Sequence, residues 1–219
     1  MRNLTRCFMK YSRPLNDLLG QQSKVNILRH LANTRLEMSG RQIASDIGMS
    51  PWACHRALQD LTDQGVLVMR NMGRTYLFRL NEESYVVEEL LLPLFEKEKH
   101  LLEAAIREMV DGLSESIVSI ILYGSVSRGE ERPSSDLDVL VLVSTDADQD
   151  QMQELFAEKN DYFISRFGNV LSPIILSIAE FRQRYRGGDG LLREIVDTGR
   201  VIHGRLISEV LHEPQEDSQ

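Results

Sequence analysis

The sequence predicts an α+β protein with two domains that are joined by a helical connector. Three observations support this prediction. Apolar residues recur at helical spacing in the first eighty residues and strand-like runs follow them, a long amphipathic stretch begins after residue 81, and strand-like and helical runs alternate from Ile117 onward. We expect the first domain at residues 13–81, the connector at 82–113 and the second domain at 114–212.

The composition is that of a globular protein and not of a fibrous, disordered or membrane-spanning one. Of the 219 residues, 42% are hydrophobic and 26% are charged. The longest unbroken apolar run is Val139–Val143, whereas a membrane-spanning helix needs about 20 such residues. Residues 1–11 lack the apolar core of a signal peptide, and Cys7 and Cys54 are too few for a disulfide framework. We expect a cytoplasmic protein with no membrane partner.

Charge is distributed unevenly along the chain. Residues 1–80 contain 12 Lys and Arg against 5 Asp and Glu, whereas residues 81–219 contain 13 against 28. The formal net charge of the whole chain is −8. A basic first domain permits nucleic-acid binding even when the whole chain is acidic.

The first domain is expected to contain three short helices followed by a β-hairpin. The apolar positions of the helices are Val25, Ile27, Leu28 and Leu31, then Ile43, Ala44 and Ile47, then Ala57, Leu58 and Leu61. Ser50 and Pro51 form a start signal for the third helix, because serine caps a helix and proline fits its first turn. Strand-like runs at 66–70 and 75–80 flank a turn at Asn71-Met72-Gly73.

This order of three helices and a hairpin is that of a winged helix-turn-helix, and residues 42–81 resemble MarR/ArsR-like bacterial regulators. The resemblance implies that the third helix enters the major groove of double-stranded DNA. Helical phase turns Cys54 and Leu58 inward. The residues expected to contact DNA are Ser50, Trp52, His55, Arg56 and Gln59 at the third helix and Arg70 and Arg74 beside the hairpin tip. The alternative is a winged helix that binds a protein or a second copy of the chain.

The connector is expected to be a long amphipathic helix. Asn81 is a candidate N-cap with acids at the next two positions, and Pro93 should kink or break the helix near Leu92. One apolar stripe is expected to contain Leu94, Leu101, Leu102, Ala105, Ile106 and Met109. The stripe packs either on its own chain or between subunits. We expect a homodimer, because winged-helix regulators commonly pair on two half-sites.

The second domain contains a motif whose residue types indicate a chemical function. A strand-like run at 117–123 ends in Gly124-Ser125, where glycine permits a close approach of the backbone to a phosphate. Further along, Asp136-Leu137-Asp138 leads into an apolar strand-like run. Because strand side chains alternate, both aspartates should point to the same face. Two carboxylates beside a phosphate favour the binding of Mg²⁺ or Mn²⁺, for which their oxygens are suitable ligands.

Residues 123–129 and 135–138 together resemble the nucleotidyltransferase superfamily of DNA polymerase beta, and its minimal nucleotidyltransferases in particular. The resemblance implies an α/β fold with a small mixed sheet and the transfer of a nucleoside monophosphate from a nucleoside triphosphate (NTP) to a hydroxyl. It also implies the site residues: Gly124, Ser125 and Arg128 bind the nucleotide, and Asp136 and Asp138 are catalytic and hold the metal.

Members of this superfamily usually add a third carboxylate from a later strand. The corresponding segment here, residues 170–177, contains no acid. Ser172 stands at a plausible location for that group, and Glu180 is the nearest substitute. Whether the domain is an active enzyme therefore stays open at the level of sequence.

The whole order of elements resembles prokaryotic proteins that fuse a winged helix to a minimal nucleotidyltransferase domain. The expected function is that of a DNA-binding transcriptional regulator that binds ATP or another NTP with magnesium and transfers a nucleoside monophosphate to a protein or a small molecule. Two alternatives remain: a regulator that senses nucleotide without catalysis, and an antitoxin that nucleotidylates a partner toxin.

Overall fold

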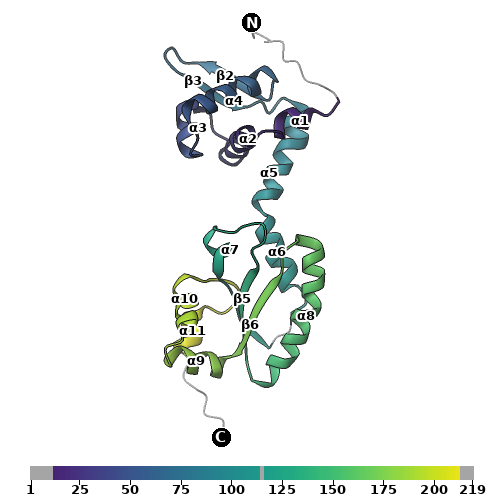
Figure 1. The fold of residues 1–219 in the computed structure, drawn as a ribbon, viewed down its shortest axis with the longest axis vertical. Coiled ribbons are helices and arrows are strands. Elements are labelled where there is room, and N and C mark those ends of the chain that lie inside the picture. Colours follow the sequence, from purple (N-terminus) through teal and green to yellow (C-terminus); the bar gives the residue numbers. More distant parts are fainter. Residues whose placement is uncertain (1–11, 114–115, 213–219) are drawn as a thin grey trace. The chain divides into compact units, whose positions relative to one another are not determined.

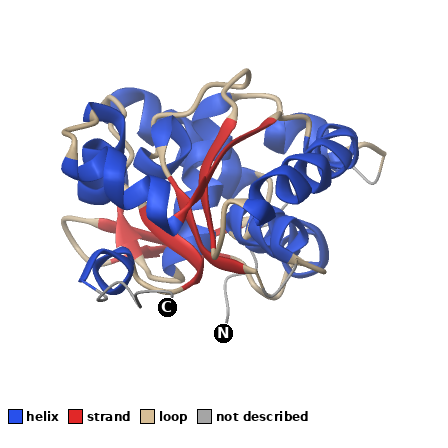
Figure 2. Cartoon of the chain, turned by 90° about the horizontal axis from the view of Figure 1, so that it is seen from below, coloured by secondary structure: helices blue, strands red, loops and turns tan. Residues whose placement is uncertain are grey.

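The computed structural model describes residues 12–113 and 116–212, and the chain divides into two compact units at 1–101 and 102–219 (Figure 1). Cys7 and the first two residues of the predicted second domain lie outside the described residues. Strands, drawn red in Figure 2, lie among helices, drawn blue, so the predicted α+β class is confirmed. No helix of the described residues is long and apolar enough to cross a bilayer.

The first unit has the winged-helix order. Its helices and strands are α1 (Pro14–Leu19), α2 (Gln22–Thr34), β1 (Met38–Ser39), α3 (Gly40–Asp46), α4 (Pro51–Asp63), β2 (Leu67–Asn71), β3 (Tyr76–Leu80), the π-helix η1 (Val87–Leu91) and α5 (Leu92–Lys99). The strands form an antiparallel sheet in the order β1-β3-β2. Sequence periodicity misses α1 and β1, because runs of six and two residues carry too little periodic signal.

The ends of α3 and α4 are fixed by serine caps. The Ser39 hydroxyl accepts from the Gln42 N–H at the start of α3, and the Ser50 hydroxyl accepts from the Ala53 N–H at the start of α4. Proline in the first turn of α4 costs no hydrogen bond, because that position has no partner for an N–H inside the helix. The predicted start of the third helix is confirmed.

The predicted long connector helix is irregular near Leu92, as Pro93 suggests, but it is also interrupted at His100, between the end of α5 at Lys99 and the start of α6 at Leu101. Asn81 does not cap a helix: its side-chain amide donates to the Gly65 carbonyl at 2.8 Å, which closes the base of the hairpin, and helical backbone begins only at Tyr85. Pro93 lies in the first turn of α5, immediately after η1. A π-helix relieves the backbone at the position where proline supplies no N–H.

The predicted apolar stripe packs on its own chain only in its second part. Ala105 and Met109 are buried in a core of the second unit, and Leu102 and Ile106 pack against that core. Leu94 and Leu101, the first two residues of the predicted stripe, are exposed. Four of the six predicted residues therefore contribute to one core.

The second unit is built around a mixed sheet, as predicted. Its helices and strands are α6 (Leu101–Val110), β4 (Ile117–Leu122), α7 (Gly124–Arg128), β5 (Leu137–Val143), α8 (Ala147–Phe167), β6 (Leu171–Ser177), α9 (Ile178–Arg186), α10 (Gly190–Thr198), β7 (Arg200–Gly204) and α11 (Ile207–His212). The strand order is β6-β5-β4-β7, in which β5 and β6 are parallel and the other pairs are antiparallel.

Helices cover both faces of this sheet. Helices α6 and α8 pack on one face, and α9, α10 and α11 pack on the other (Figure 1). Strand β5 lies inside the sheet, so its side chains are buried alternately in both cores: Val139 and Val141 in the first, Leu140 and Leu142 in the second. This two-sided burial explains the continuous apolar sequence of β5.

A buried lysine connects three helices of the first unit. The Lys24 ammonium donates to the Asp17 carbonyl at 2.7 Å and pairs with the Asp60 carboxylate at 2.5 Å. Lys24 is only 4% exposed. The ammonium keeps the pKa of Asp60 below its usual range, chiefly by a hydrogen bond. The contact therefore holds the helix expected to bind DNA, α4, against α2 and the end of α1.

We predict that Lys24→Ala destabilises the first unit by about 1–3 kcal/mol, because it leaves a carbonyl and a carboxylate without their cation. Urea denaturation followed by the fluorescence of Trp52, the single tryptophan, measures this. The matched control is Glu82→Gln, which breaks an exposed ion pair with Arg35 and should cost less than about 0.5 kcal/mol. Superimposable curves for the two variants would contradict the assignment.

Candidate functional site

The candidate site is centred on a contact between Gly124 and Asp138. Gly124 has a φ of +73°, which favours glycine, and a Cβ placed there would lie 2.1 Å from Asp138 Oδ2. The Asp138 carboxylate therefore rests directly against the backbone at the start of α7. Only glycine satisfies both conditions at this position.

Strand pairing fixes the position of Asp138 along the sheet. The Tyr123 N–H donates to the Asp138 carbonyl at 3.0 Å, and Leu122 pairs with Val139 across β4 and β5. Asp138 is half-buried and has the same strand parity as Leu140. It therefore emerges on the face that α9, α10 and α11 cover.

Asp136 precedes β5 by one residue and is exposed. Its charge is close enough to raise the pKa of Asp138, although partial burial of the Asp138 carboxyl is the larger cause of that increase. The Arg128 guanidinium acts in the opposite direction. Burial, followed by the charge of Asp138, also raises the pKa of Tyr123 to about 12. Four of the predicted residues, Gly124, Arg128, Asp136 and Asp138, thus meet at one end of the sheet.

Arg128 is tied to a partner that the sequence did not indicate. Its guanidinium donates to Glu130 at 3.1 Å and to Glu194 of α10 at 3.2 Å. Ser125, the fifth predicted residue, lies half-buried in α7 beside Gly124. Glu194 is 66 positions from Arg128 in the chain, so no local pattern links the two.

Among the described residues, no third carboxylate groups with the pair. Strand β6 pairs with β5 in parallel, and Ser172 is the partner of Asp138 in this register. Across residues 12–113 and 116–212, no group of three or more His, Cys, Asp or Glu side chains could hold a metal ion. The serine expected at this location is therefore the neighbour of Asp138.

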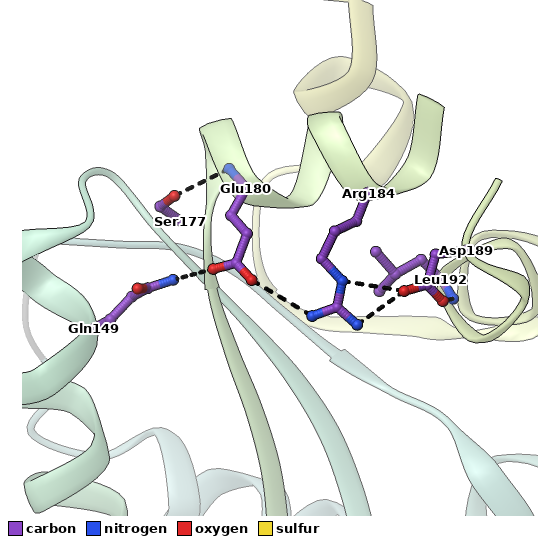
Figure 3. A network of polar contacts seen from close by, with 6 residues as sticks. All are labelled: Gln149, Ser177, Glu180, Arg184, Asp189 and Leu192. Atoms are coloured by element: carbon purple, nitrogen blue, oxygen red, sulfur yellow. Dashed lines mark hydrogen bonds and ion pairs between the residues drawn. The ribbon is translucent and has the colours of Figure 1, made fainter. Parts of the chain in front are cut away.

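Glu180 is not a substitute for that carboxylate, and the suggestion that it stands nearest to the site is wrong. It follows Ser177, at the end of β6 opposite to Ser172. Five residues of strand separate the two serines by about 16 Å. Glu180 instead accepts from Gln149 at 2.8 Å and pairs with Arg184 (Figure 3).

The network around Glu180 supports the fold at the far end of the sheet. Arg184 also donates to Asp189 at 2.8 Å (Figure 3). Asp189 caps α10 by accepting from the Leu191 and Leu192 N–H groups. The Ser177 hydroxyl accepts from the Glu180 N–H and caps α9. These contacts connect α8, α9 and α10, and they leave Glu180 a structural role.

The two aspartates fit a divalent cation. They are carboxylates of like charge held close together, and one is partly buried, so a cation would relieve both repulsion and desolvation. Asp136 and Asp138 are the residues that would hold it. A bound cation would neutralise phosphate oxygens and polarise the reacting phosphorus centre.

In the first unit the predicted DNA-contacting residues lie on the exposed face of α4. Trp52, His55, Arg56 and Gln59 are exposed, whereas Cys54 and Leu58 are buried, as helical phase predicts. The Arg56 guanidinium lies 5.8 Å from the centre of the Trp52 ring. These side chains line one wall of a surface groove of about 740 Å³, which continues to Gln21 and Ser23.

The predicted wing residues differ in their surroundings. Arg70 pairs with Glu37 through two hydrogen bonds, one of them 2.9 Å long, and these bonds lower the pKa of Glu37. Arg74 is exposed in the turn between β2 and β3. Ser50 uses its hydroxyl oxygen to cap α4 and keeps a hydroxyl proton to donate.

Comparison with known proteins finds a matching family model and a similar protein. The family model of the nucleotidyltransferase domain matches residues 103–200. A protein of Methanocaldococcus jannaschii that carries the name of a protein adenylyltransferase is 30% identical over 105 residues, which are 46% of this chain and 97% of that protein. Residues 103–200, which the family model matches, include Gly124 and both aspartates.

Solved structures similar to part of the chain include a transcriptional repressor. NolR from Sinorhizobium fredii is 23% identical, with a TM-score of 0.33, and the match covers 37% of this chain and 78% of that one. The antimony-specific repressor AntR is 21% identical, with a TM-score of 0.35, and the match covers 48% of this chain and 94% of that one.

We predict that Asp138→Asn stabilises the second unit at neutral pH. The folded-state pKa of Asp138 is raised, so the ionised carboxylate costs stability above that pKa and the cost disappears as the carboxyl becomes protonated. Thermal unfolding at pH 7 and at pH 3.5 measures the difference, which should be positive at pH 7 and small at pH 3.5. A variant that is less stable than the wild type at pH 7 would refute this account of the carboxylate.

Proposed function

The chain belongs to the nucleotidyltransferase domain family, and on that premise we propose that its second unit binds an NTP with a divalent cation and transfers the nucleoside monophosphate to a hydroxyl group. The observation that supports the proposal is the contact between Gly124 and the Asp138 carboxylate, with Asp136 close enough to raise the pKa of Asp138. Mg²⁺ or Mn²⁺ is the proposed cation, because both prefer carboxylate and phosphate oxygens.

In the proposed reaction the acceptor oxygen forms a bond to the α-phosphorus, the bond to the β-phosphate oxygen breaks, and pyrophosphate leaves while the hydroxyl loses its proton. Gly124 allows the phosphates to approach the backbone, and Ser125 offers a hydroxyl donor. Arg128 supplies positive charge once the triphosphate replaces its carboxylate partners, Glu130 and Glu194. A protein hydroxyl is the proposed acceptor class, since the M. jannaschii relative is named for transfer to protein.

One observation favours a second candidate, a regulator that binds nucleotide and does not transfer it. Ser172 stands beside Asp138, where a carboxylate could act as general base. Loss of a general base typically costs about 10²- to 10⁴-fold in rate. A toxin as the acceptor remains a prediction from the sequence alone.

The nucleotide proposal predicts label transfer from α-³²P-labelled ATP with Mg²⁺ to protein in an extract of the cells that make the chain. Asp138→Asn should abolish transfer, because it removes a cation ligand. Asp161→Asn, which removes an exposed carboxylate of α8, is the matched control and should transfer normally. Calorimetric binding of Mn²⁺ and α,β-methylene-ATP without label transfer supports the sensor, and no binding contradicts both.

We propose that the first unit binds double-stranded DNA, with two chains on paired half-sites. The exposed face of α4, with Arg56 and Gln59 at its centre, supports this, as does the basic balance of residues 1–80. Arg70 donates to Glu37 through Nε and Nη2, so Nη1 is the group that would contact a phosphate. In this proposal the chain is a transcriptional regulator with a nucleotide-dependent second unit.

We predict that Arg56→Ala weakens specific DNA binding by about 1–3 kcal/mol if the side chain contacts a base. Lys97→Ala, at the exposed end of α5, is the control and should bind as the wild type does. Fluorescence anisotropy against a fragment selected from a genomic library measures both, and affinity should fall steeply with salt. Equal binding by the two variants would exclude Arg56 from the interface.

A further inference from the structure

Asn169 connects the end of α8 to the segment that carries Asp136. Helix α8 ends at Phe167, Gly168 follows with a φ of +82°, and β6 begins at Leu171. Between them, the side-chain amide of Asn169 donates to the Ser135 carbonyl at 2.8 Å. Ser135 is the residue immediately before Asp136.

The backbone is held on both sides of Asp136 by the same short segment. On the other side, the Leu137 N–H donates to the Val170 carbonyl at 2.8 Å. The turn before Asp136 is closed by the Arg132 N–H, which donates to the Ser135 hydroxyl at 2.9 Å. Residues 169 and 170 therefore set where the backbone of Asp136 lies.

Asp136 needs this support more than Asp138 does. Asp138 lies within β5, paired with Ser172 on one side and held by the Tyr123 N–H on the other. Asp136 lies outside the strand and is exposed. Its position relative to Asp138 therefore depends on the hydrogen bonds that flank it.

The supporting segment is itself fixed to α8. The Leu171 N–H donates to the Asn160 side-chain oxygen at 2.9 Å. A long helix thus holds the start of β6, and Asn169 extends this anchorage to Ser135. A donor on a rigid element can hold a metal ligand in place more precisely than a free loop can.

We propose that Asn169 is a positioning residue for the proposed cation site of Asp136 and Asp138, and that it acts through Asp136. By fixing the Ser135 carbonyl it sets the separation of the two carboxylates and so the affinity for the cation. This inference rests on the proposed function of the same site. It assigns a role to a side chain that contacts neither the cation nor the nucleotide.

The test is the affinity of the full chain for Mn²⁺ with α,β-methylene-ATP, measured by calorimetry. Asn169→Ala should weaken binding about tenfold, which is typical when a supporting partner of a metal ligand is lost. Gln153→Ala is the matched control: it removes an exposed side-chain amide from α8, leaves the bond to Ser135 in place, and should change the affinity less than twofold. Asn169→Ser is the second variant if the first fails to fold.

A mutant cycle shows whether the effect passes through Asp136. In a chain that already carries Asp136→Asn, Asn169→Ala should change the affinity less than twofold. An equal loss in both backgrounds, or an unchanged affinity in the single variant, overturns the inference. If the wild type binds no Mn²⁺ with the nucleotide analogue, the proposed function itself fails, and this result is distinct from the other two.

Discussion

The second unit depends on the placement of one carboxylate against one glycine. Asp138 enters the sheet on β5 in the register that brings its oxygen to the backbone of Gly124, where no Cβ can stand. The surrounding strands are buried on both faces, so the register cannot shift by one residue without moving Asp138 into a core. The cost is a partly desolvated charge beside a second one. Such a cost is typical of functional sites, where stability is given up for chemistry.

Much of this arrangement could be predicted because it follows from short-range rules. Strand alternation predicts the face of Asp138 on β5, although Asp136 precedes that strand. A glycine at the end of a strand permits close backbone approach, as at Gly124. In the first unit, Ser50 with Pro51 correctly predicts the start of α4, since a cap and a first-turn proline are local signals. Helical phase likewise separates the exposed Arg56 from the buried Leu58.

What could not be predicted depends on contacts between distant segments. Asn81 carries the signal of a helix cap, yet the Gly65 carbonyl of the hairpin takes its amide. Glu180 follows β6 closely in sequence, but the parallel direction of the strands carries it to the opposite end of the sheet. Glu194 and Asn169 have no periodic or motif signal, because their roles arise from the partners that the fold brings to them.

The central claim is that Asp136 and Asp138 hold a cation between themselves and a triphosphate at the Gly124 turn. A crystal of the chain soaked with Mn²⁺ and α,β-methylene-ATP, with data collected at the manganese edge, tests it most directly. The account predicts an anomalous peak in contact with oxygens of both aspartates and with the phosphates. A peak and a nucleotide at the Glu180 end of the sheet, or a nucleotide bound away from both aspartates, would contradict it.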